Sequence, residues 1–79
     1  MSLWYINGQG VALYSVGQML PGKYEFGKPD CIEHTRVTRG WMVVNGEKFK
    51  AGESFVCQPG EDIAITTRVT TAWFTRFEH

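Results

Sequence analysis

Charged side chains on two strand-like segments are the groups in this sequence that could do chemistry. In the segment 33–39, period-two alternation puts Glu33 and Arg39 on one face and Arg36 on the other. A carboxylate enclosed in a small β-domain needs a partner or takes a raised pKa. Arginine matches a phosphate bidentately, so Arg39 and the later Arg76 are candidate anion ligands. Arg36, out of phase with Glu33, is expected to face solvent.

Each of these groups also has a structural interpretation. Glu33 could form a salt bridge with Arg39 or Arg76, or reach water at the rim of the domain. Either arginine could be a surface residue whose aliphatic stem packs on its neighbours. The residue types alone leave both interpretations open.

Three further side chains are candidate ligand contacts. Tyr24 and Phe26 share one face of a strand, where they could stack on a ligand or fill the core. Gln58 precedes the turn Pro59-Gly60 and could hydrogen-bond a ligand or the turn itself.

Histidine and cysteine are too sparse to predict a metal site. His34 adjoins Glu33, so the two side chains should point to opposite faces of a strand. Cys31 and Cys57 are too few and too far apart for a disulfide scaffold or a zinc site. We interpret both as reduced thiols, and neither has a base at a spacing that would make it a nucleophile. The sequence predicts no metal and no cofactor.

The composition bounds the class of protein. A chain of 79 residues is long enough for one domain, 1–79, in which 1–3 and 78–79 are typical of residues added in cloning. Eight basic and eight acidic residues cancel, which argues against a nucleic-acid partner. No signal peptide and no apolar run of roughly 20 residues is present, so we expect a cytoplasmic protein without a membrane partner.

Short strands must position these side chains. Glycines and prolines divide the sequence into pieces rich in Val, Thr, Ile and aromatic residues, and none has sustained helical periodicity. The expected strands are 4–6, 11–16, 23–26, 33–39, 41–44, 47–50, 54–57, 63–67 and 72–77. Asn45-Gly46 predicts a two-residue hairpin turn between two of them. Eight or nine short strands without helices predict an all-β, antiparallel barrel.

Several of these segments resemble known families. Glu33 followed by Gly40, and Gly52 through Pro59-Gly60, resemble parts of the two cupin motifs. A closer resemblance is to the small pyrimidine/purine nucleoside phosphorylases, which are single-domain cupins. It rests on segments 15–19, 22–26 and 51–55, on Pro59-Gly60, and on the ending 73–77. The segment before residue 15 and the short hairpin at 45–46 depart from that family.

The resemblance implies a small cupin-type β-barrel, jelly-roll-like, that acts as a homodimer. It implies metal-free phosphorolysis of purine and pyrimidine nucleosides to free base and ribose 1-phosphate. In the cupin register Glu33 points inward and would orient a base or bind ribose hydroxyls. Arg39 and Arg76 would hold phosphate, and Tyr24, Phe26 and Gln58 would contact the ligand.

A second hypothesis is a non-catalytic cupin module that binds a small ligand or serves in assembly. A third, an oligonucleotide-binding barrel, is disfavoured by the zero net charge.

Overall fold

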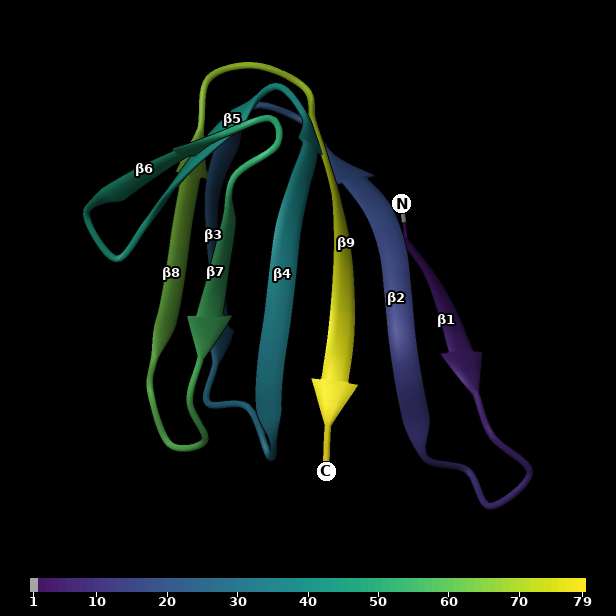
Figure 1. Cartoon of the computed structure of the whole chain (residues 1–79). Coiled ribbons are helices and arrows are strands. Elements are labelled where there is room, and N and C mark those ends of the chain that lie inside the picture. The colour runs from purple at the N-terminus through teal and green to yellow at the C-terminus, as the bar shows by residue number, and fades with distance from the viewer. Residues whose placement is uncertain (1) are drawn as a thin grey trace.

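The computed structural model describes residues 2–79, which form nine strands and no helix (Figure 1). The strands are β1 (Ser2–Ile6), β2 (Ala12–Met19), β3 (Gly22–Gly27), β4 (Ile32–Arg39), β5 (Trp41–Val44), β6 (Glu47–Lys50), β7 (Ser54–Cys57), β8 (Ile63–Thr67) and β9 (Thr71–Glu78). All nine were predicted, four of them with the observed bounds. The main difference is β2, which continues to Met19 rather than ending at residue 16.

The strands form two antiparallel sheets that face each other as a flattened barrel (Figure 1). One has five strands in the order β1-β2-β9-β4-β7, and the other has four in the order β3-β8-β5-β6. This is the predicted all-β, cupin-type architecture. No helix long and apolar enough to cross a membrane occurs in residues 2–79.

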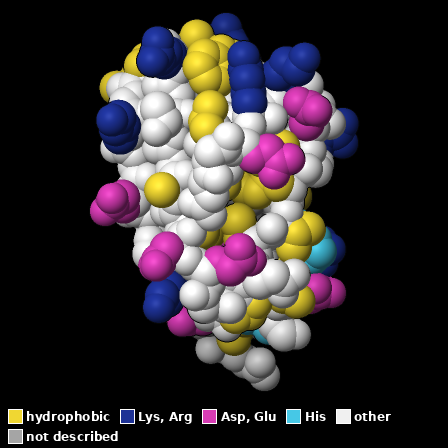
Figure 2. Space-filling view, turned by 90° about the vertical axis from the view of Figure 1, so that its left-hand side faces the viewer, with side chains coloured by type: hydrophobic (Ala, Val, Ile, Leu, Met, Phe, Trp, Pro, Cys, Tyr) yellow, Lys and Arg dark blue, Asp and Glu magenta, His cyan; other side chains and the backbone are white. Residues whose placement is uncertain are grey.

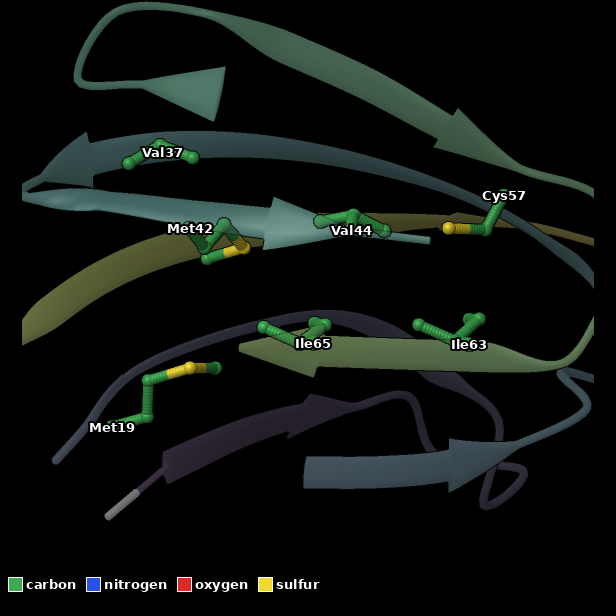
Figure 3. Packing of buried hydrophobic residues seen from close by; sticks show 7 residues of the cluster. All are labelled: Met19, Val37, Met42, Val44, Cys57, Ile63 and Ile65. Carbon is green, nitrogen blue, oxygen red and sulfur yellow. The ribbon is translucent and has the colours of Figure 1, made fainter. Parts of the chain in front are cut away.

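The core lies between the sheets because the strands that form it turn alternate residues inward. Its buried side chains come from β2, β4, β5, β7 and β8, and Figure 3 shows them converging. They are Met19, Val37, Met42, Val44, Cys57, Ile63 and Ile65.

The predicted hairpin at Asn45-Gly46 is confirmed. Both residues have positive φ, 48° and 87°, as a type I′ turn between β5 and β6 requires. The Asn45 side chain also binds the next strand: its Nδ2 donates to the Asp62 carbonyl, and its Oδ1 accepts from the Ala64 N–H, both at 2.9 Å. The turn therefore ties β5 to the start of β8.

Two threonines are buried where β8 ends and β9 begins, at the upper end of the barrel in Figure 1. The Thr67 and Thr71 hydroxyls lie 2.9 Å apart, and each is 2.7 Å from the Trp41 carbonyl oxygen. Their exposed fractions are only 1% and 0%. These buried hydroxyls are therefore satisfied by hydrogen bonds to each other and to the backbone.

Candidate functional site

A cavity of about 210 Å³ lies between the two sheets. The four-stranded sheet and its neighbours supply an apolar wall that includes Met42, Ile63, Ile65 and Phe26. Two lining residues, Trp4 on β1 and Phe26 on β3, are 56% and 55% exposed, so they border an opening to solvent. β1 and β3 are each an edge strand of their sheet. The cavity is therefore reached from outside past these edges.

The facing wall, on the five-stranded sheet, carries hydroxyl groups. Ser15 pairs with Thr75, and Thr75 pairs with Thr35, so the three side chains cross adjacent strands in one row. The Thr35 and Thr75 hydroxyl oxygens lie 2.8 Å apart and share a hydrogen bond. All three residues are buried and line the cavity. One wall thus offers polar groups while the other offers none.

Glu33 stands beside this row, two residues before Thr35 on β4. In the register it lies opposite Phe77 on β9 and Cys57 on β7, and all three line the cavity. Within residues 2–79 its carboxylate makes no hydrogen bond or ion pair. Burial raises the pKa of the Glu33 carboxyl above its ordinary value of 4.5. Neither Arg39 nor Arg76 forms with it the salt bridge that the structural interpretation allowed.

Replacing Glu33 with glutamine should change how stability depends on pH. The folded chain holds the Glu33 proton more tightly than the unfolded chain, whose carboxyl titrates near 4.5. The free energy of unfolding therefore falls as the pH rises from 4.5 through the raised folded-state pKa. Below pH 4.5 this carboxyl causes no loss of stability, because it is protonated in both states. Relative to the parent, Glu33→Gln should therefore raise the melting temperature more at pH 8 than at pH 4. Glu47→Gln, on the exposed hairpin, is the control, and an equal gain at both pH values would contradict the prediction.

Both cysteines are buried and free. Burial, followed by the Glu33 and Glu61 carboxylates, raises the pKa of the Cys57 thiol to about 11. Burial, Glu33 and Asp30 likewise raise the pKa of the Cys31 thiol. The thiolate is the nucleophilic form, so these are unreactive thiols near neutral pH.

Aromatic side chains complete the cavity. Trp4 stacks on Phe77, the cross-strand neighbour of Glu33, with ring centroids 5.3 Å apart. Trp73 and Phe55 line the cavity from β9 and β7. Phe26 lies across from them on β3, as part of the apolar wall. Aromatic rings from several strands thus line the same cavity as Glu33.

The two arginines predicted to join Glu33 do not reach this cavity. Arg76 alternates with Thr75 and Phe77, which point inward, so it lies exposed on the outer face. Arg39 should share the phase of Glu33, but an irregularity between Val37 and Arg39 breaks the alternation, and Arg39 is exposed. The predicted convergence of Glu33 with both arginines is wrong.

The other predicted residues divide between cavity and scaffold. Phe26 lines the cavity, whereas Tyr24 packs against the core beside it and donates its hydroxyl hydrogen to the Leu20 carbonyl. Gln58 is exposed in a turn, where its backbone N–H donates to Glu61 Oε1 at 2.7 Å. His34 faces outward toward Glu78, at 3.1 Å, as the alternation predicted.

Sequence reasoning missed the hydroxyl row and most of the aromatic lining. The phase that singled out Glu33 also marks Thr35, and the alternation of the last strand puts Trp73, Thr75 and Phe77 on one face. The sequence therefore contained the alternation that marks these residues. It did not contain the information that these strands are neighbours in one sheet.

Residues 2–79 bring no three His, Cys, Asp or Glu side chains together in a group that could hold a metal. The expected absence of a metal stays a prediction.

Three solved structures are similar to this chain. Protein VPA0057 of Vibrio parahaemolyticus, of unknown function, is 33% identical, with a TM-score of 0.78 over 95% of this chain and 83% of that one. A DUF1255 protein of unknown function from Acinetobacter sp. ADP1 is 16% identical, with a TM-score of 0.73 over 99% of this chain and 93% of that one. A putative ethanolamine utilization protein Q from Salmonella typhimurium LT2 is 18% identical, with a TM-score of 0.74 over 96% of this chain and 66% of that one.

These comparisons correct the predicted family. No family model and no curated protein matches the chain, and none of the three similar structures is described as a nucleoside phosphorylase. The cavity agrees, because its lining in residues 2–79 includes no lysine, arginine or histidine to hold phosphate. The two distant structures support the cupin-type fold alone. The identity with VPA0057, over most of both chains, shows more: the chain belongs to the same protein family as VPA0057.

Proposed function

We propose that this protein is a small-ligand-binding cupin module that holds its ligand between the two sheets. The observation that carries the proposal is the cavity of about 210 Å³, with hydroxyls on one wall and apolar side chains on the other. Binding sites for small molecules are mostly apolar, with a few placed polar groups that fix orientation. The Ser15–Thr75–Thr35 row and Glu33 are such groups here.

The size of the cavity limits the ligand. An apolar cavity of about 150 Å³ is large enough to bind benzene. A space of about 210 Å³ therefore suits one ring or a short branched chain with a polar substituent. A nucleoside with phosphate beside it is much larger.

The chemistry of the lining favours binding over catalysis. Covalent catalysis needs a nucleophile with a base in hydrogen-bond reach. Cys57 is held as a neutral thiol by its raised pKa, about 11. Glu33 has no partner within residues 2–79 that would set it up as one half of an acid–base pair.

The assembly alternative draws on a separate surface. On the outer face of the five-stranded sheet, Tyr14 stacks on Tyr5 at 4.4 Å and lies 5.7 Å from Phe74. These rings are partly exposed. Exposed aromatic residues are enriched on surfaces that bind another protein. Homodimerisation through this face stays a prediction.

A probe of one ring tests the binding function. Benzyl alcohol, titrated into the full chain and followed by NMR, should shift resonances of cavity residues such as Met42, Ile65 and Thr75. The variant Ser15→Leu fills part of the cavity and should weaken binding at least about tenfold, a loss of about 1.4 kcal/mol. Ser54→Leu makes the same change at an exposed position on β7 and should leave binding unchanged.

Two results would contradict the proposal. One is shifts that fall only on the outer faces of the sheets. The other is equal affinity in Ser15→Leu and the parent, with both shown to be folded by their dispersed spectra.

A further inference from the structure

We propose that the ligand is a small organic cation: an amine or ammonium group on a compact apolar body, with its positive charge beside Glu33. This inference rests on the proposed binding function and names its ligand class. It excludes phosphates and carboxylates from the same site.

The charge of the cavity gives the first argument. Among the lining residues in the described chain, Glu33 is the only one that can carry a charge near neutral pH, and no cation accompanies it. An anionic ligand would meet the Glu33 carboxylate with no positively charged side chain in the described lining to offset the repulsion. A cationic ligand would supply the partner that Glu33 lacks within residues 2–79. It would also offset the cost of ionising a carboxyl whose pKa burial has raised.

The aromatic lining gives the second argument. The negative faces of tryptophan and phenylalanine rings attract cations, and sets of such rings recognise ammonium groups. Trp4 and Phe77 are stacked at 5.3 Å, and Phe77 is the cross-strand neighbour of Glu33. Trp73 adds a second ring from β9, and Phe55 and Phe26 add rings from β7 and β3. A carboxylate among aromatic rings favours a cation more than a neutral ligand of the same shape.

The hydroxyl row gives the third argument. The Thr35 and Thr75 oxygens, 2.8 Å apart, retain lone pairs that can accept from an ammonium N–H. The opposite wall of Met42, Ile63 and Ile65 has only apolar groups. The charged end of the ligand therefore belongs on the five-stranded sheet and its apolar body on the four-stranded sheet.

Acidic side chains surround the same end of the barrel. Asp30, in the loop before β4, acts with Glu33 on the Cys31 thiol, and Glu61, in the loop before β8, acts with Glu33 on the Cys57 thiol. On the face of the four-stranded sheet, Figure 2 shows acidic side chains across the middle and lower part and most basic ones at the upper end. Lys28, in the loop before β4, is a basic residue among them. The excess of carboxylates would raise the local concentration of a cation.

Three probes of one shape test the inference. Benzylamine, benzyl alcohol and benzoate are titrated into the full chain at pH 7, with binding followed by NMR. Benzylamine should bind at least about tenfold more tightly than benzyl alcohol, which is about 1.4 kcal/mol. Benzoate should bind more weakly than either. In Glu33→Gln the advantage of benzylamine over benzyl alcohol should disappear, and Glu47→Gln, an exposed glutamate, should retain it.

The outcomes separate the two proposals. If benzyl alcohol binds in the cavity but benzylamine binds no better, the cation is wrong and the binding function stands. If benzoate binds as tightly as benzylamine, the cation is likewise wrong and the binding function stands. If none of the three binds, both proposals fail. The comparison of probes in the parent chain decides these cases even if Glu33→Gln does not fold.

Discussion

Replacing Gly40 with alanine is expected to destabilise the fold by about 2–5 kcal/mol, the sum of two separate costs. Gly40 has φ of +78°, a left-handed conformation that costs a residue with a Cβ roughly 1–2 kcal/mol. The added Cβ would also lie 2.7 Å from the Thr70 carbonyl oxygen and 2.9 Å from Thr71 Oγ1. Thr71 is fully buried and hydrogen-bonded to the Trp41 carbonyl, so it cannot move aside cheaply.

Gly52→Ala is the matched control for Gly40→Ala. Gly52 has φ of +91°, but an added Cβ would meet nothing within 4 Å. It should show the backbone cost alone, roughly 1–2 kcal/mol. Urea denaturation of both variants measures the difference. Equal losses at the two glycines would show that the contact of Gly40 with Thr70 and Thr71 is not tight.

The strands were predictable because local patterns decide them. Val, Ile, Thr and aromatic segments between turn residues fix where strands lie, and Asn45-Gly46 fixes one hairpin outright. The length of β2 was underestimated because Gly17 interrupts the local strand pattern. In the structure, pairing with β9 continues the strand to Met19. Tertiary pairing, which no local pattern displays, overrides the weak strand propensity of glycine.

The candidate site was only half predictable. Glu33 was placed correctly because period-two alternation holds from Glu33 to Val37. Arg39 was misplaced because one extra residue in β4, relative to β9, inverts the alternation after Val37. Arg76 was assigned from a resemblance, although its own alternation with Thr75 and Phe77 pointed outward. The hydroxyl row needs three strands in one register, and a single sequence does not specify which strands are neighbours.

The division of the cavity into two walls follows from the fold. β4, β9 and β2 turn Thr35, Thr75 and Ser15 inward, and hydroxyls are tolerated there because they can bond to one another or reach the cavity. β5 and β8 turn Met42, Ile63 and Ile65 inward, and these belong to the core that holds the sheets together. Residues of the apolar wall should therefore affect stability and ligand size together.

Replacing Met42 with alanine should show both effects. Met42 is 1% exposed and belongs both to the core and to the cavity lining (Figure 3). Truncating a buried methionine to alanine costs about 2–5 kcal/mol, because packing contacts are lost and a void remains. The exposed Val56 is the control: at 50% exposure, Val56→Ala should change the free energy of unfolding by at most about 0.5 kcal/mol.

The enlarged cavity should accept a larger ligand. 2-Naphthylmethanol, which extends benzyl alcohol by a second ring, should bind Met42→Ala more tightly than the parent, because its extra ring replaces the lost side chain. At about 100 times its Kd, such a ligand stabilises the folded state by about 2.7 kcal/mol, which offsets much of the loss. Thermal unfolding with and without the ligand measures this directly. If Met42→Ala loses stability but gains nothing from the larger ring, the space beside Met42 belongs to the core alone, and the ligand cavity does not extend to the four-stranded sheet.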